Sequence, residues 1–255
     1  LAFMVVDRNR AARIGSTHTK AVDAKTCLMG NLSGFNRDLT VIFAIGKDDQ
    51  CLLSFSLGFR QTGVLGIQPK SDGGWMLHTD DGELAAEKLI IAAGAWSARL
   101  LEPLGYKVPL EAERGYHLVL KDPGVTVNNS IMDTDAKFVA SSMSAGVRCA
   151  GTAEFAGLDA PPDYRRARVF IRLAQRLFPG INTKDRIEWM GSRPSFPDSL
   201  PCLGEVPGQP GLFTAFGHSH YGFGMAPNTG RVVAEVVSGA TPNIDMSPYH
   251  IGRFA

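Results

Sequence analysis

Residues 88–97 read Lys88-Leu89-Ile90-Ile91-Ala92-Ala93-Gly94-Ala95-Trp96-Ser97 and carry the strongest structural signal in the chain. A continuous apolar run is typical of a strand that is covered on both faces of a sheet, so we predict a strand over 88–93. The run stops at Gly94, and the small residues beside it let the backbone approach a bulky flat ligand. A tight turn from strand to helix also needs small residues, and this segment alone favours neither interpretation.

On either side of this strand, turn residues and hydrophobic periodicity divide most of the chain into strands and helices. Two hairpin turns, Gly73-Gly74 and Asp81-Gly82, precede it, and a helix over 95–104 follows it. Further strands are predicted over 1–6, 39–45, 63–67, 75–79, 113–120, 125–132, 138–142, 187–190 and 212–215, and further helices over 161–178 and 230–237. Strands and helices alternate at both ends around a strand-rich middle. This order predicts an α/β nucleotide-binding domain interrupted by an antiparallel substrate domain.

Composition excludes several classes of function. Lys and Arg number 26 against 25 Asp and Glu, so the net charge of +1 gives no reason to expect binding to nucleic acid or to an anionic membrane. The cysteines Cys27, Cys51, Cys149 and Cys202 lie far apart without C-x-x-C spacing, which favours reduced thiols. No apolar run is long enough to span a bilayer, and the first residues are too short for a signal peptide. We therefore expect a soluble, cytoplasmic protein.

Arg193 is the first candidate for binding a substrate. It lies in Gly191-Ser192-Arg193-Pro194-Ser195-Phe196-Pro197-Asp198-Ser199-Leu200-Pro201, which we interpret as a rigid Pro-rich loop. A guanidinium held in one geometry is suited to a bidentate grip on a carboxylate. The alternative is an ordinary arginine that pairs with Asp198 or Glu188.

A glycine-laced loop, residues 217–230, precedes the predicted helix over 230–237. A loop of this kind that enters a helix presents unpaired backbone N–H groups and the positive end of the helix dipole, which favour an anion. One alternative is a metal site at His218 and His220, interpreted as two side chains on the same side of a strand, although no carboxylate or cysteine stands at metal spacing. Another is ordinary helix capping by Asn228 or Thr229.

Four segments together resemble the family of D-amino-acid oxidases and dehydrogenases, which includes glycine and sarcosine oxidases. They are Ala92–Ser97, Glu113–His117, the segment around Arg193, and Gly217–Gly230, in that order along the chain. The sequences of the second and fourth segments are most similar to the small subunit of bacterial D-amino-acid dehydrogenase. The resemblance implies a mixed α/β fold with a Rossmann-like FAD/NAD(P)-binding domain over 1–104 and 187–255, and an inserted antiparallel substrate-binding domain over 105–186.

The resemblance also implies FAD as the cofactor and assigns residues to it. The residues implied to contact FAD are Asp7, Val64, Ala92, Ala93, Gly94, Trp96, Gly217, His218, Ser219, His220, Tyr221 and Gly222. Arg193 would hold the substrate carboxylate, while Tyr116 and His117 would line the substrate site. No metal is implied.

The implied reaction is oxidative deamination of a small amino acid, with D-amino acids favoured, by hydride transfer from the α-carbon to flavin N5. The electron acceptor, oxygen or a quinone, and the oligomeric state stay open, and a membrane-associated acceptor is compatible with the dehydrogenase branch. Two alternatives stay open as well: an oxidase of sarcosine or another N-methyl amine, and a truncated, catalytically silent relative that acts as a binding protein. The second arises because the sequence contains no Gly-x-Gly-x-x-Gly motif, so that we interpret 1–6 as the second strand of an incomplete Rossmann-like domain.

Overall fold

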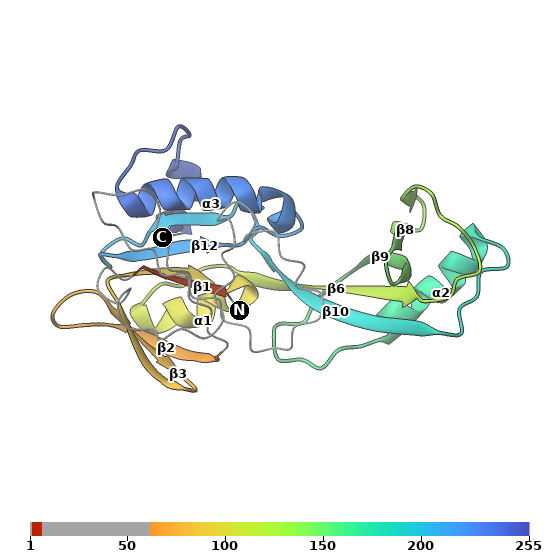
Figure 1. Ribbon diagram of the computed structural model, residues 1–255, viewed down its shortest axis with the longest axis horizontal. Coiled ribbons are helices and arrows are strands. Elements are labelled where there is room, and N and C mark those ends of the chain that lie inside the picture. The colour runs from red at the N-terminus through yellow and green to blue at the C-terminus, as the bar shows by residue number, and fades with distance from the viewer. Residues whose placement is uncertain (1, 7–61, 255) are drawn as a thin grey trace, which may run out of the picture. The chain divides into compact units, whose positions relative to one another are not determined.

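The computed structural model describes residues 2–6 and 62–254, which belong to two compact units (Figure 1). Unit 1 combines Leu1–Leu110 with Pro194–Ala255, and unit 2 is the inserted segment Glu111–Arg193. The boundaries predicted from the sequence fall after residues 104 and 186. Asp7, Cys27, Cys51 and the strand predicted over 39–45 lie outside the described residues.

Unit 1 is built on a four-stranded mixed sheet. In sheet order its strands are β1 (Ala2–Val6), β5 (Lys88–Ala92), β12 (Leu212–Phe216) and β11 (Cys202–Glu205). β12 runs parallel to β5 and antiparallel to β11. β1 runs antiparallel to β5. The second strand of a Rossmann-like sheet would run parallel to its neighbours, so the direction of β1 differs from our interpretation of residues 1–6.

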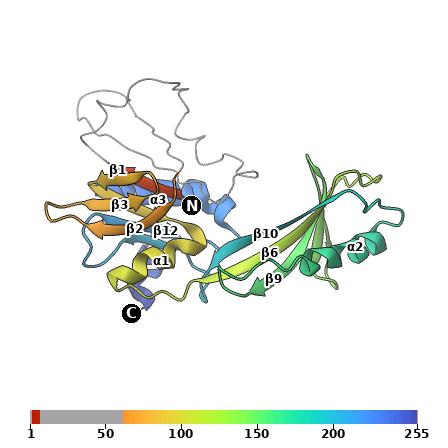
Figure 2. The same cartoon turned by 90° about the horizontal axis from the view of Figure 1, so that it is seen from below.

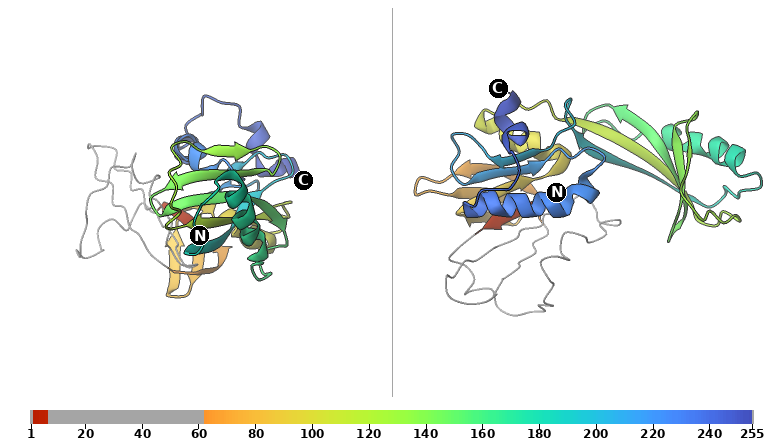
Figure 3. Two further views of the ribbon diagram at one scale, coloured as in Figure 1. Left: turned by 90° about the vertical axis from the view of Figure 1, so that its right-hand side faces the viewer. Right: turned by 90° about the horizontal axis from the view of Figure 1, so that it is seen from above.

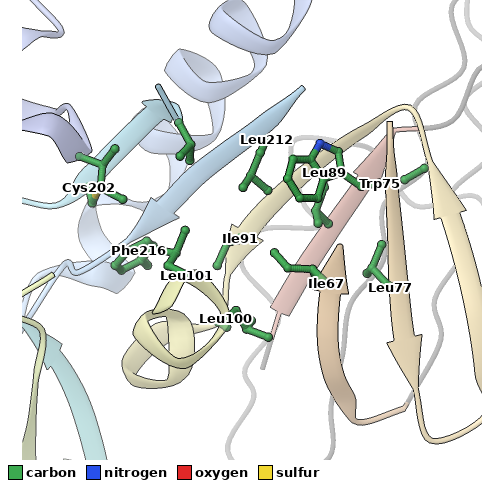
Figure 4. Close-up of a cluster of buried hydrophobic side chains, with 14 of the residues drawn as sticks. Ile67, Trp75, Leu77, Leu89, Ile91, Leu100, Leu101, Cys202, Leu212 and Phe216 are labelled. Carbon is green, nitrogen blue, oxygen red and sulfur yellow. The ribbon is translucent and has the colours of Figure 1, made fainter. Parts of the chain in front are cut away.

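β5 is buried on both faces, as its apolar sequence predicts. Leu89 and Ile91 pack against the three-stranded antiparallel sheet of β2 (Val64–Pro69), β3 (Trp75–Thr79) and β4 (Gly82–Ala86). The same core also includes residues of helix α1 (Ser97–Leu101) (Figure 4). Ile90 points to the opposite face and packs against Val233 and Val237 of α3 (Gly222–Ser238). Unit 1 is therefore layered, with the mixed sheet between α3 and the three-stranded sheet (Figure 1).

The helix predicted over 95–104 is a series of three short pieces. They are η2 (Gly94–Trp96), α1 (Ser97–Leu101) and η3 (Glu102–Leu104). Pro103 stands in the first turn of η3, where its missing N–H and fixed φ are tolerated. Two short 3₁₀ turns, η4 (Ser247–Tyr249) and η5 (Ile251–Phe254), follow α3. Neither they nor any other helix in residues 62–254 is long and apolar enough to span a membrane.

Unit 2 is a five-stranded sheet with one helix on it. In sheet order the strands are β10 (Arg186–Ser195), β6 (Glu111–Leu120), β9 (Gly146–Phe155), β8 (Phe138–Met143) and β7 (Ile131–Asp133). The pairs β6–β9, β9–β8 and β8–β7 are antiparallel, as expected for the inserted unit. Helix α2 (Arg165–Leu177) lies along β6 and β9 on one face, and its Phe170 and Ala174 pack there against Leu118, Leu120 and Cys149 (Figure 2 and Figure 3).

Three elements of unit 2 differ from the prediction. β10 runs on to Ser195, past the predicted end at residue 190. Of the strand predicted over 125–132 only Ile131 and Met132 are in a strand, because Gly124 and the polar run Asn128-Asn129-Ser130 favour irregular backbone. β9 was not predicted, since Gly146 and Gly151 interrupt its apolar pattern. All three differences concern the same sheet, and none changes the fold class.

Candidate functional site

The carboxyl ends of β5 and β12 lie at one edge of the mixed sheet of unit 1. The two strands are parallel, with Leu89 opposite Leu212 and Ile91 opposite Thr214. The segments that follow them, residues 93–96 and 217–221, therefore begin at the same edge. In open α/β sheets ligands bind outside the carboxyl ends of strands. The sheet thus brings together two of the segments that the sequence analysis assigned to a cofactor.

At the end of β5 the backbone has free space beside it that a ligand can occupy. Gly94 has φ +55°, a left-handed conformation, and a Cβ built on it would meet nothing within 4 Å. Trp96 beside it is 39% exposed, although Ala93 and Ala95 are buried. The buried hydroxyl of Ser97 has no hydrogen-bond partner in the described part of the chain. Open space, an exposed aromatic ring and an unpartnered hydroxyl are together typical of a ligand site.

The loop after β12 is fixed by close packing. Gly217 has φ +89°, and a Cβ added to it would overlap the ring of Phe196. Ser219, also at positive φ, donates its backbone N–H to the carbonyl of Pro194 at 2.9 Å. The His218 ring lies 3.0 Å from Oγ1 of Thr229, and burial lowers the pKa of His218. His218 and His220 are in this loop and not on a strand, which corrects the interpretation behind the metal alternative.

Helix α3 begins at Gly222, eight positions before the predicted start at residue 230. Its N-cap residue, Tyr221, makes no side-chain capping hydrogen bond, and no acidic residue stands in the first turn. Asn228 and Thr229 lie inside the helix, so the capping alternative is wrong. The start was missed because Gly222, Gly224 and Pro227 all have poor helix propensity, which tertiary packing overrides here. The N-terminus of α3 therefore directly follows the loop that begins at the sheet edge.

Large aromatic side chains are exposed around this edge. Tyr221 is 68% exposed and Phe223, in the first turn of α3, is 74% exposed. Together with Trp96 they present apolar surface beside backbone donors, an arrangement suited to a flat ring with one anionic side. Val64, the remaining described residue assigned to FAD, begins β2 and packs against the core of unit 1.

In unit 2, Arg193 lies on strand β10 and not in a loop. Its Nη1 donates to Oε1 of Glu113 at 3.2 Å, and its guanidinium lies over the Cα of Gly115. Neither partner suggested by the sequence is used, since Glu188 accepts from Arg168 and Asp198 from Arg253. The side chain is 28% exposed, so an ion-paired guanidinium is held on β6 with part of its surface open.

His117 lies on the same face of the sheet as Arg193. Its ring stacks on Trp189 with centroids 4.7 Å apart and an interplanar angle of 21°. Burial first, and then the charges of Arg148 and Arg193, lower the pKa of His117 to about 4. Its buried Nδ1 has no partner among the residues that the structure describes. His117 is therefore a neutral imidazole between cations at neutral pH.

Tyr116 points to the opposite face, because successive residues of a strand alternate. Its hydroxyl donates to Glu154 Oε2 at 2.6 Å and accepts from the backbone N–H of Asp163 at 3.0 Å. Glu154 also pairs with the buried Arg114 and with Arg166 of α2. Tyr116 is 1% exposed. The structure thus places Tyr116 in a hydrogen-bond network that fixes α2. This position differs from the one expected of a residue that lines the substrate site.

Metal ligands do not gather anywhere in residues 62–254, where no group of three His, Cys, Asp or Glu side chains is suitably arranged. Cys149 and Cys202 are buried free thiols. Burial raises the pKa of Cys149 to about 11, so this thiol stays protonated and unreactive at neutral pH.

Comparison with known proteins agrees with a cofactor site at the sheet edge of unit 1. Residues 59–236, more than half of the chain, match the DAO family model, described as FAD dependent oxidoreductase. The chain belongs to this family. The DAO chain is 41% identical over 180 residues to a D-amino-acid oxidase of Bradyrhizobium diazoefficiens, and 40% identical over 186 residues to a D-amino acid dehydrogenase of Paramagnetospirillum magneticum. These alignments cover 69% and 70% of the chain and 43% of each relative.

Solved structures give the same fold. Glycine oxidase from Geobacillus kaustophilus superposes with a TM-score of 0.66 at 28% identity, covering 76% of the DAO chain and 52% of that structure. L-proline dehydrogenase from P.horikoshii, at 20% identity and a TM-score of 0.63, shares the fold. The DAO chain thus spans about half the length of the proteins it matches, and the mixed α/β fold expected from the sequence is confirmed.

The described residues fit one end of an FAD molecule. The open left-handed Gly94, the unpartnered Ser97 hydroxyl and the N-terminus of α3 are suited to the ring and its anionic side. The glycine motif that would hold the pyrophosphate is not in the sequence, and Asp7, assigned to the ribose, is outside the described residues.

Sequence reasoning missed three residues that shape the face around Arg193. They are Gly115, which gives its guanidinium room, Trp189, which stacks on His117, and Arg148, whose charge acts on His117. The motif residue Glu113 was quoted without a role, although it is the ion-pair partner of Arg193. The period-two alternation of β6 was the available signal, because residues 113, 115 and 117 share a face.

Proposed function

We propose that this DAO chain carries out FAD-dependent oxidative deamination of a small amino acid, with D-amino acids favoured. The observation that carries the proposal is the guanidinium of Arg193, held on β6 by Glu113 and 28% exposed. Membership of the family and the 41% identity to a D-amino-acid oxidase support it.

In this proposal unit 1 holds FAD. Gly94 and Trp96 at the end of β5, and the segment Gly217–Gly222 after β12, would hold the ring end, and Val64 the adenine end. The N-terminus of α3 would stabilise negative charge on a bound ring. When bound, FAD supplies the two-electron acceptor that the oxidation of a C–H bond beside nitrogen requires.

Unit 2 holds the amino acid by its carboxylate. Arg193 has five N–H donors and one of them is used by Glu113 at 3.2 Å, which leaves an edge of the fork for a bidentate contact. Glu113 is a positioning residue, because its ion pair restricts the rotamer of Arg193. The substrate amine is oxidised to an imine, and water then releases a keto acid and ammonia.

His117 is not a strong base in this scheme. With a pKa of about 4, it is neutral at pH 7 and holds a proton poorly. We infer that the amino acid enters with a neutral amine, and that His117 contributes a flat wall stacked on Trp189 together with the unpartnered Nδ1. A cytoplasmic location and oxygen or a quinone as electron acceptor stay predictions.

The test compares Arg193→Leu with Arg193→Lys. Arg193→Leu should raise KM for a D-amino acid about 10- to 100-fold, because each hydrogen bond to a charged group contributes about 1.5–3 kcal/mol. Arg193→Lys keeps the charge without the fork and should recover part of the loss. Flavin content, measured from visible absorption after incubation with FAD, should equal that of the native chain in both variants.

Unchanged kinetics in Arg193→Leu would remove Arg193 from the substrate site. A colourless chain that cannot be reconstituted with FAD would contradict the redox function itself. The products separate the main proposal from oxidation of an N-methyl amine, since the first releases ammonia and the second an aldehyde.

A further inference from the structure

Arg148 stands on the same sheet face as His117 and Arg193. It is on β9 with Val119 of β6 as its Cα partner, and paired residues of antiparallel strands share a face. The next residue, Cys149, points the other way into the core under α2. The Arg148 side chain therefore projects from the face of unit 2 that α2 does not cover.

Arg148 is a half-buried cation without a counter-ion. No hydrogen bond or ion pair to it occurs in the described part of the chain, and it lies close enough to Arg193 for their charges to interact. Burial first, and then the charge of Arg193, lower the pKa of the Arg148 guanidinium. A desolvated charge beside a like charge is unfavourable unless an anion binds there, and such groups are typical of functional sites.

The acidic groups around this face do not neutralise it. Glu113 pairs with Arg193. Glu154 belongs to the opposite face, where it pairs with Arg114 and Arg166. Glu188, on β10, pairs with Arg168 and Arg186. Since His117 is neutral and Glu113 offsets Arg193, Arg148 is left as a positive charge without an ion-pair partner in the described part of the chain, beside the position assigned to the substrate.

The geometry points to Arg148 as a specificity-determining residue that binds a second anionic group of the substrate, so that the protein favours acidic amino acids such as D-glutamate. This inference rests on the proposed function, because it takes the α-carboxylate to be bound by Arg193. It adds a substrate class and a residue that the proposed function does not use.

The spacing of the two arginines fits such a ligand. Arg193 lies over Gly115, and Arg148 is paired with Val119, four residues further along β6. Four residues of a strand span about 13 Å, and an extended arginine side chain reaches roughly 7 Å. Both guanidiniums act on His117, which is midway between these positions. They can therefore approach two carboxylates about 5 Å apart, the separation in an extended glutamate.

The experiment measures equilibrium binding and not turnover. The full chain, incubated with FAD and then kept fully reduced with dithionite under anaerobic conditions so that it cannot oxidise the ligand, is titrated with D-glutamate and with its neutral isostere D-glutamine by isothermal calorimetry. We expect D-glutamate to bind about 10- to 100-fold more tightly, the value of one charge-assisted contact. Arg148→Gln should weaken the binding of D-glutamate and leave the binding of D-glutamine nearly unchanged. The ratio of the two affinities should therefore fall to within about twofold of unity. Arg148→Lys should keep part of the ratio and also decides the matter if Arg148→Gln does not fold.

The matched control is Arg168→Gln. It removes one positive charge from the same unit, but on α2, where Arg168 pairs with Glu188. The ratio should stay at the native value. Equal binding of both amino acids by the native chain, failure of both to bind, a ratio that survives in Arg148→Gln, or the same loss in Arg168→Gln would each overturn the inference.

Anaerobic flavin reduction separates this inference from the proposed function. Selective binding of D-glutamate without any reduction of flavin would contradict the proposed function and leave the role of Arg148 standing. Equal binding and equally rapid reduction with D-glutamate and D-glutamine would uphold the proposed function and contradict the role of Arg148.

Discussion

The guanidinium of Arg193 occupies the space that a side chain at Gly115 would fill. A Cβ added at residue 115 would overlap Nη1, Nη2 and Cζ of Arg193. Glu113, two residues earlier on the same face of β6, accepts from Nη1 at 3.2 Å. One strand thus supplies both the missing side chain that makes room for the arginine and the carboxylate that orients it.

Gly115→Ala should therefore weaken substrate binding without unfolding the protein. The methyl group must displace the far end of a flexible side chain, which costs little stability but moves Arg193 out of its ion pair. We expect KM to rise about tenfold or more, the effect of losing one charged hydrogen bond, with an unfolding free energy within about 1 kcal/mol of native. Steady-state kinetics and urea denaturation measure the two.

The control for this change is Gly66→Ala on β2, where an added Cβ meets nothing within 4 Å. It should leave both quantities near their native values. Native KM in Gly115→Ala would show that the position of Arg193 does not matter for substrate.

Tyr116→Phe and Glu154→Gln test whether Tyr116 is structural. The Tyr116 hydroxyl joins Glu154 to the backbone of Asp163 just before α2, so its loss should destabilise unit 2 by about 1–2 kcal/mol. Glu154→Gln leaves the fully buried Arg114 without its counter-charge and should cost about 3 kcal/mol or more. Both are measured by urea denaturation, and kcat per bound flavin should stay native in Tyr116→Phe. A large fall in that kcat at native stability would restore Tyr116 to the catalytic site.

The fold was predictable where one physical signal dominated. The apolar run around Ile90 required a strand covered on both faces, and Leu89, Ile90 and Ile91 are indeed buried against two different layers. The early start of α3 was not predictable from local sequence, because Gly222 and Gly224 disfavour a helix that packing against the sheet stabilises. The direction of β1 is likewise a property of pairing, which a run of apolar residues does not encode.

For the candidate site, the sequence indicated which residue types take part better than it indicated the face of the sheet to which each side chain points. Motif resemblance selected Tyr116 and His117 together, but adjacent strand residues point to opposite faces, so the two have different surroundings. Arg148 and Trp189 had no motif, and only the pairing of β9 and β10 with β6 brings them to the face of His117. Long-range strand pairing thus decides which residues share the site.

Gly94→Ala tests the place of FAD in unit 1. Gly94 has a left-handed backbone and open space beside it, which we assign to the flavin. An alanine there costs roughly 1–2 kcal/mol of backbone strain and puts a methyl group into that space. We expect FAD affinity, measured by flavin fluorescence on titration, to fall at least about tenfold, since each 1.4 kcal/mol of lost contact is a factor of ten.

Gly105→Ala is the matched control for backbone strain. Gly105 also has positive φ, at +89°, also has open space around its Cβ position, and follows η3 in the same unit. It should lose similar stability and keep native FAD affinity. An equal loss of affinity in both variants would mean that strain and not contact explains the effect at Gly94.

Because of His117, the stability of the protein should decrease as the pH decreases through a defined range. Burial, followed by the charges of Arg148 and Arg193, lowers its pKa from 6.5 to about 4. Between these values the unfolded chain binds a proton that the folded chain does not, so stability is complete above pH 6.5 and is lost as pH falls toward 4. Each pKa unit corresponds to about 1.4 kcal/mol, and since part of the ring is exposed we expect a loss of about 2–3 kcal/mol.

His117→Phe isolates this contribution, because phenylalanine can stack on Trp189 and does not titrate. Urea denaturation of both proteins at intervals from pH 7 to pH 4 gives two stability curves, and carboxylates contribute equally to each. The difference between the curves should be flat above pH 6.5 and should change steadily below it, with the native protein losing more. Parallel curves across the whole range would show that His117 is protonated as easily in the folded protein as in the unfolded chain, and would remove burial and the two neighbouring arginines as the source of its neutrality.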